Sequence, residues 1–177
     1  MEGPSGEPAA ICISEVESPP ARLLGAGFFA NTSGGGMMDL AWKEELSVGN
    51  ATIDSDHKKL IVMVNGLEAM IKARDNFALA QAFEQIERHL CAHFVNEEKI
   101  AEAVHFSFGR NKLEHQHLLK EFQHMKDELV VKNGIWSDSA SEHYGRFLSN
   151  WVIGHILNED MLMKPALQSH PYDLKSD

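Results

Sequence analysis

HFVNE, at residues 93–97, is the most informative segment of this chain because it puts His93 four residues before Glu97. On a helix, residues four apart lie on the same face. Apolar residues recur around the pair at helical spacing, which predicts that the pair points inward: Phe83, Ile86, Leu90 and Phe94. A carboxylate buried beside an imidazole is unfavourable unless a cation lies between them. The segment therefore indicates a metal site, with a surface His–Glu pair on a helix as the alternative.

The composition favours a globular protein and argues against two kinds of partner. The chain has 177 residues, of which 44% are hydrophobic, and a formal net charge of −10. This length and hydrophobic content are typical of one domain with a real core. Nucleic-acid binding needs a basic patch, and a membrane span needs a longer apolar run than any in the chain. We therefore expect neither nucleic acid nor membrane as a partner.

Cysteine usage and the N-terminal sequence favour a cytoplasmic protein. The two cysteines, Cys12 and Cys91, lie far apart and do not form a disulfide framework. Cys91 falls in a helical pattern and is expected to be a small buried hydrophobe. The N-terminus has neither the basic start nor the apolar core of a signal peptide.

Residues 1–38 differ in composition from the rest of the chain. They are rich in Gly, Pro, Ser and Ala and show no sustained periodicity. This pattern predicts a disordered or non-native N-terminal extension, followed by one domain over residues 39–177. Met37 and Met38 directly precede that domain, so the natural start is expected at one of them.

Four amphipathic segments are expected to form helices, because apolar residues recur in each at helical spacing. Their ranges are 54–74, 77–104, 111–131 and 137–165. Asp54 is the candidate N-cap of the first, Asn133-Gly134 ends the third and Pro165 ends the fourth. Trp42, in the loop before the first helix, is expected to anchor the core. The sequence thus predicts an all-α fold, an up-down-up-down antiparallel four-helix bundle with an N-terminal loop.

Each predicted helix carries a candidate metal ligand on its apolar face. Besides His93 and Glu97 on the second helix, these are His57, His115 and His155 on the other three. A single inward histidine is usually a satisfied core residue, but one from each of four helices points to a metal site in the bundle core. Mixed imidazole and carboxylate ligation suits iron, zinc or manganese.

Several motifs, in order and at suitable spacing, resemble those of the hemerythrin family and of the bacterial hemerythrins in particular. They are WKEELSVG at 42–49, IDSDHKKL at 53–60, NGL at 65–67, HFVNEE at 93–98, KLEH at 112–115 and WVIGHILNED at 151–160. The resemblance covers residues 40–165. It implies two iron ions, joined by an oxo or hydroxo bridge, with O₂ as their ligand.

The resemblance also implies a set of metal ligands. The residues that match the family's motifs are His57, His93, Glu97, His115, His155 and Asp160. In the family, the first two histidines hold the iron that binds O₂, the last two hold the other iron, and both carboxylates bridge. Because Asp160 follows His155 by five residues, which is not the spacing of one helix face, we predict a π-bulge between them.

Asn111 stands where the family's HxxxH motif has its first histidine. The alternative register, which starts the motif at His115, would end it at Leu119, and a leucine cannot bind metal. We therefore keep Asn111 in the ligand position, with His117 and His105 pointing away from the site. An amide is a weaker ligand than an imidazole, so the second iron is expected to be weakly held, or open to water or another ligand.

These features favour a non-haem diiron protein that binds O₂ reversibly, for storage, transport, delivery or sensing. They favour a binding protein over an enzyme. Asn111 keeps two alternatives open: a diiron peroxidase, oxidase or nitric-oxide-handling enzyme, and a metal-depleted interaction module. The expected partner is O₂, and the chain is expected to be a monomer or a weak homo-oligomer.

Overall fold

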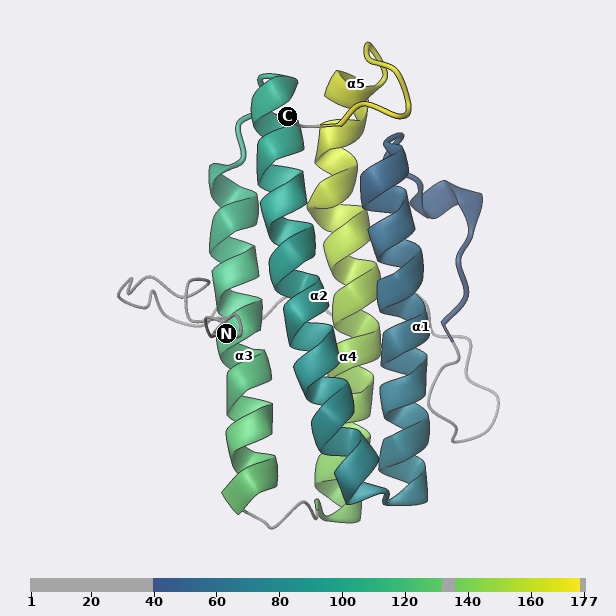
Figure 1. The fold of residues 1–177 in the computed structure, drawn as a ribbon, viewed down its shortest axis with the longest axis vertical. Helices are drawn as coiled ribbons and strands as arrows, with labels where there is room; N and C mark the ends of the chain where they lie inside the picture. The colour runs from purple at the N-terminus through teal and green to yellow at the C-terminus, as the bar shows by residue number, and fades with distance from the viewer. Residues whose placement is uncertain (1–39, 132–135, 176–177) are drawn as a thin grey trace, which may run out of the picture. The chain divides into compact units, whose positions relative to one another are not determined.

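Four long helices lie side by side along a common direction in the computed structural model, which describes residues 40–131 and 136–175 (Figure 1). Their bounds are Ala51–Ala73 for α1, Asn76–Ala103 for α2, Gly109–Val131 for α3 and Asp138–Asn158 for α4. Helix α2 packs against α1 and α3, and α1 also packs against α4. No strand occurs among the described residues. The predicted all-α four-helix bundle is confirmed.

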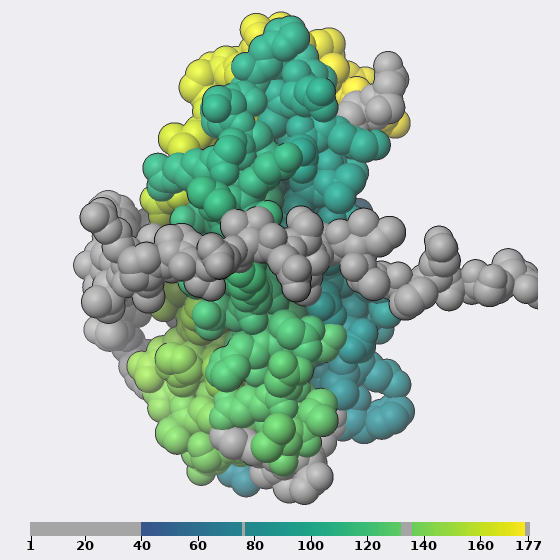
Figure 2. All heavy atoms as spheres, turned by 90° about the vertical axis from the view of Figure 1, so that its left-hand side faces the viewer, coloured from purple at the N-terminus to yellow at the C-terminus, as the bar shows by residue number. Residues whose placement is uncertain are grey.

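Three short elements complete the described chain: the 3₁₀ helix η1 at Glu44–Leu46, the 3₁₀ helix η2 at Asp160–Met163 and α5 at Lys164–Leu167. Both views place α5 at the same end of the bundle as the C-terminal end of α2 (Figures 1 and 2). The extension predicted at 1–38 and the helix stop predicted at Asn133-Gly134 lie outside the described residues. None of the described helices has the length and apolar character needed to cross a membrane.

Helix α1 begins earlier than predicted, and Asp54 is not its N-cap. The side chain of Asn50 caps it by accepting hydrogen bonds from the backbone N–H groups of Thr52 and Ile53. Asp54 is buried in the first turn, where its carboxylate accepts from the backbone N–H of Val48 at 2.9 Å. The Tyr172 hydroxyl donates to the same carboxylate at 3.0 Å. Asp54 therefore ties the loop before α1 to the C-terminal segment.

The inward faces of the helices form one apolar core along the bundle. It includes Leu60, Leu67, Phe83, Leu90, Phe122, Met125, Leu148 and Val152, each at most 1% exposed. The rings of Phe83 and Phe122 lie 5.0 Å apart between α2 and α3, and Trp136 meets Phe83 edge-on at 5.7 Å. Burying each large side chain stabilises the fold by about 1.5–3 kcal/mol. This packing fixes the rotation of every helix about its axis, and so decides which polar side chains point inward.

Two predictions about the loop and α4 are wrong. Trp42 is only half-buried, with Lys58 Nζ 4.8 Å from its ring, and the loop instead buries Leu46 and Val48. Helix α4 ends at Asn158 rather than at Pro165, which lies in the first turn of α5. Proline is tolerated there because the first N–H groups of a helix have no intrahelical acceptor.

Cys91 is half-buried, so the prediction that it is a buried residue is also wrong.

Candidate metal centre

Six of the seven candidate ligands lie together in the bundle core, each at most 5% exposed. They form two overlapping groups, and within each group the potential ligand atoms lie within 4.8 Å of one another. The first group is His57, His93, Glu97 and Asp160; the second is Glu97, His115, His155 and Asp160. The two carboxylates thus belong to both groups, and each group adds two imidazoles of its own.

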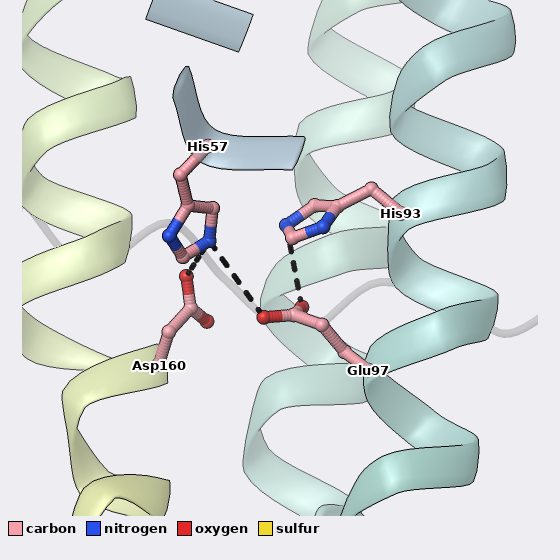
Figure 3. Close-up of side chains that lie close together, drawn as sticks. All are labelled: His57, His93, Glu97 and Asp160. Carbon is pink, nitrogen blue, oxygen red and sulfur yellow. Dashed lines mark ion pairs between the residues drawn. The ribbon is translucent and has the colours of Figure 1, made fainter. Parts of the chain in front are cut away.

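In the first group, the four side chains converge on a common point (Figure 3). His57 Nε2 lies 3.2 Å from Asp160 Oδ2 and 3.9 Å from Glu97 Oε1. His93 Nε2 lies 3.6 Å from Glu97 Oε2, as expected for residues one helical turn apart on α2. The carboxylates come from α2 and from η2, so the group depends on three segments of the chain.

In the second group, the same carboxylates face a second pair of imidazoles. His115 Nε2 lies 3.3 Å from Glu97 Oε2, and His155 Nε2 lies 3.2 Å from Asp160 Oδ1. The two Nε2 atoms are themselves 3.2 Å apart. Asp160 therefore presents one oxygen to each group, the arrangement needed for a carboxylate that bridges two cations.

The buried polar atoms of this cluster fit a bound cation. Among the residues that the structure describes, neither oxygen of Glu97 or Asp160 has a hydrogen-bond partner, and neither ring nitrogen of His57 or His93 has one. Leaving buried polar groups without partners is strongly unfavourable, whereas a cation among them would satisfy carboxylates and imidazoles together. The donor set, imidazole nitrogen with carboxylate oxygen, is one that iron, zinc and manganese accept.

The protonation states of the imidazoles also suit metal binding. Burial lowers the pKa of His57 and of His155 to about 4, although nearby carboxylates oppose the shift. Burial, together with the neighbouring His155, lowers the pKa of His115 to about 2. Burial lowers the pKa of His93 as well. All four rings are therefore neutral at pH 7, and a neutral imidazole is the form that binds metal.

The pKa values of the two carboxyl groups are shifted in the opposite direction, upward. Burial raises the pKa of Glu97 well above its ordinary value, and the nearby charge of Asp160 adds to this effect. Burial also raises the pKa of Asp160. In this cluster, a carboxyl group that is protonated or bound to a metal ion is therefore favoured over a free carboxylate.

The backbone after α4 places Asp160 in the cluster, and it does so without the predicted π-bulge. The N–H of Glu159 donates to the carbonyl of His155 at 2.9 Å, which closes a regular last turn of α4. The N–H of Leu162 then donates to the carbonyl of Glu159 at 3.1 Å, which opens the 3₁₀ helix η2. The prediction is wrong because the helix ends here rather than widening. The change of helix type brings Asp160 beside His155, while Glu159 pairs with Arg110 at 2.6 Å.

Asp56 is a supporting residue of the first group. Its Oδ2 lies 3.9 Å from His93 Nδ1 and accepts a hydrogen bond from Asn96 Nδ2 at 3.2 Å. Burial alone would raise the pKa of Asp56, but the interactions with His93 and Asn96 outweigh it and hold the pKa below its ordinary value. A carboxylate beside the second ring nitrogen orients a metal-binding histidine. His89, which is partly buried, lies with Nε2 3.0 Å from the backbone oxygen of Asp56.

Aromatic rings cover the imidazoles of the second group. Phe94 stacks on His115 with ring centroids 3.6 Å apart, and Trp151 stacks on His155 at 5.1 Å. Phe108 meets His115 edge-on at 5.4 Å. It lies just before α3, where helical periodicity gives no signal.

Asn111 lies on α3 one turn before His115 and is 1% exposed. Its amide nitrogen has no hydrogen-bond partner in the described part of the chain. His105 and His117 are exposed, as predicted.

The fold and this cluster together define a four-helix-bundle protein with a candidate cation-binding centre in its core. The family model of the Hemerythrin HHE cation binding domain matches residues 48–167. The chain belongs to the hemerythrin family, whose members bind non-haem iron. The resemblance inferred from the motifs is thereby confirmed.

Three relatives illustrate the range of the similarity. A bacteriohemerythrin of Pseudomonas aeruginosa is 28% identical over 141 residues, which are 80% of this chain and 90% of that protein. A bacteriohemerythrin of Stenotrophomonas maltophilia is 24% identical over 132 residues, 74% of this chain and 83% of the relative. A hemerythrin-like protein of Naegleria gruberi is 27% identical over 126 residues, 71% of this chain and 92% of the relative.

Proposed function

We propose that this protein holds two iron ions in the bundle core and binds O₂ reversibly, for storage, delivery or sensing. The observation that carries the proposal is the sharing of Glu97 and Asp160 between two groups of imidazoles. Two metal ions held by common carboxylates lie close enough to act on one small ligand. A single-metal site would need neither the second pair of imidazoles nor a carboxylate that faces both ways.

In this proposal, His57 and His93 would hold one iron and His115 and His155 the other, with Glu97 and Asp160 shared between them. When bound, the iron pair would supply the two electrons that reversible O₂ binding needs. Asp56 keeps the ring of His93 in place through its Nδ1 side, 3.9 Å away. Buried apolar rings beside the imidazoles exclude water, which limits proton entry and loss of reduced oxygen.

Asn111 favours a second candidate function, that of a diiron peroxidase, oxidase or nitric-oxide-handling enzyme. A second group with only two imidazoles leaves its metal with fewer strong ligands than a site built with three. Such a metal is more open to exogenous ligands and to further reaction. A bundle that holds no metal and acts as an interaction module is the remaining alternative.

Iron analysis and an optical spectrum distinguish these functions. The full chain is reconstituted with ferrous iron without oxygen, its iron is counted, and the spectrum is followed through cycles of air and argon. Two irons per chain, with bands that appear in air and vanish under argon, are expected. Irreversible oxidation with turnover of added hydrogen peroxide would support the enzyme instead. A colourless, iron-free chain would support the interaction module.

A matched pair of variants ties the result to the cluster. His93→Ala removes a buried imidazole of the first group, whereas His124→Ala removes an exposed one on α3. We expect His93→Ala to lose iron and the air-dependent bands, and His124→Ala to keep both. Equal iron content in the two variants would argue against the proposed ligands.

A further inference from the structure

Asn111 is a buried hydrogen-bond donor that no described residue satisfies. The residue is 1% exposed, and its Nδ2 atom has no partner within residues 40–131 and 136–175. Buried amide groups are nearly always hydrogen-bonded, and leaving one unsatisfied costs free energy. A side chain retained at this cost calls for an explanation in the chemistry around it.

The position of Asn111 ties it to the second group of imidazoles. Asn111 and His115 are four residues apart on α3, so they share one face of the helix. His115 is in turn 3.3 Å from Glu97 and 3.2 Å from His155, measured from its Nε2 atom. The unsatisfied amide is therefore one helical turn from an imidazole of that group.

The two groups offer a metal ion the same kinds and the same number of ligand residues. Each consists of two imidazoles and the shared Glu97 and Asp160. Iron held by imidazoles and few carboxylate oxygens retains open positions for exogenous ligands. Because neither group has a third imidazole, an open position is expected at both metals rather than at one.

We propose that Asn111 marks a second ligand position, at the metal held by His115 and His155, where a small anion binds and accepts a hydrogen bond from Asn111 Nδ2. The inference rests on the proposed function, since it needs two metal ions. An anion is favoured because two divalent cations exceed the charge of the two carboxylates. Few atoms fit, because Phe94 and Phe108 both pack against the ring of His115.

Azide, a small anion, is the probe for this second position. The full chain is loaded with iron, its iron content is measured first, and azide is then titrated by calorimetry with the infrared azide bands recorded alongside. We expect two azide ions per iron pair, with separate bands. Asn111→Leu, of nearly the same size, removes the donor and should weaken one of the two sites roughly 10- to 100-fold.

Asn111→His supplies a third imidazole and should abolish that site, leaving one azide per iron pair. Asn150→Leu, at an exposed position on α4, is the matched control and should bind azide like the unaltered chain. One azide per pair in the unaltered chain would overturn the inference. So would two azides of unchanged affinity in Asn111→Leu, which tests the donor even if the histidine variant fails to fold. Fewer than two irons before azide is added would refute the proposed function itself, and the second position with it.

Discussion

Glu97→Gln should affect the metal-free and metal-loaded protein in opposite directions. Glu97 is fully buried, and no described residue forms a hydrogen bond with either of its oxygens. Burial, reinforced by Asp160, raises its pKa well above the ordinary value. Without metal, the carboxyl therefore destabilises the fold, and with metal it is a shared ligand. Glutamine keeps the shape of the side chain and removes the charge.

The size of the destabilisation follows from the proton that the folded state keeps. A glutamate carboxyl in the unfolded chain has its ordinary pKa of 4.5 and is ionised at pH 7. Keeping the carboxyl protonated all the way to pH 7 would cost at most about 3 kcal/mol, because each pH unit above 4.5 adds about 1.4 kcal/mol. The folded state binds more protons than the unfolded state in this range, so the contribution destabilises increasingly as pH rises above 4.5. Glu97→Gln should raise the metal-free stability by about 1–3 kcal/mol at pH 7, and by less near pH 4.5.

The metal-loaded protein should behave in the opposite way. At free metal 1,000 times above Kd, binding stabilises the fold by about 4 kcal/mol. Loss of a shared ligand should weaken binding by at least roughly 100-fold, more than loss of an outer partner of a metal ligand. The same metal concentration would then contribute only about 1.4 kcal/mol.

Urea unfolding, with and without iron under argon, measures both effects. Glu98→Gln is the matched control, because Glu98 is the next residue on α2, is 46% exposed and pairs with Lys112. It should leave both stabilities nearly unchanged. The reasoning is refuted if Glu97→Gln lowers the metal-free stability, or if iron stabilises the Glu97→Gln variant as strongly as the unaltered chain.

Three further predictions follow from the geometry of the site and its supports. His115→Ala should lose at least one of two irons, whereas His117→Ala, on the same helix but exposed, should retain both; metal analysis of the two proteins decides. Metal binding at pH 7 should release protons, because burial raises the pKa of Glu97 and of Asp160 while the imidazoles are already neutral; a binding heat that is independent of the buffer's ionisation enthalpy would contradict this. Asp54→Ala should destabilise the fold by about 2–4 kcal/mol, because the donors in the loop and in the C-terminal segment lose their buried acceptor. Tyr172→Phe removes only one of these hydrogen bonds and should destabilise the fold by about 1 kcal/mol. Equal losses in those two variants, measured by urea unfolding, would show that the other partners of Asp54 contribute little.

The helices and their inward faces could be predicted because helical periodicity is a local property of the sequence. His93 and Glu97 share a face on any regular helix, so their pairing needs no knowledge of the fold. The helix boundaries were harder to predict, because more than one residue near the start of a helix can act as its N-cap. Asp54 looks like an N-cap, but Asn50 takes that role, and Asp54 is instead held by partners that include Tyr172, 118 residues away.

Asp160 shows most clearly what periodicity alone did not supply. Five residues after His155 is the wrong spacing for a helix, and only the resemblance to the hemerythrin family indicated this residue. The end of α4 at Asn158 and the 3₁₀ turn that follows bring its carboxylate to 3.2 Å from His155. Where a helix ends depends on the packing of the segment beyond it, here a cluster that includes Met163 and Leu167.

The sequence by itself determined four amphipathic helices, an imidazole on the inner face of each, and a carboxylate one turn from His93. Only the tertiary structure decided that the imidazoles meet in two pairs around two common carboxylates, and that Asn111, one turn before His115, is buried with its amide nitrogen unsatisfied among the described residues. The physical reason is that the face of a helix is set by residues a few positions apart. The distance between faces, by contrast, is set by side-chain packing between helices, which joins residues as far apart as His57 and Asp160.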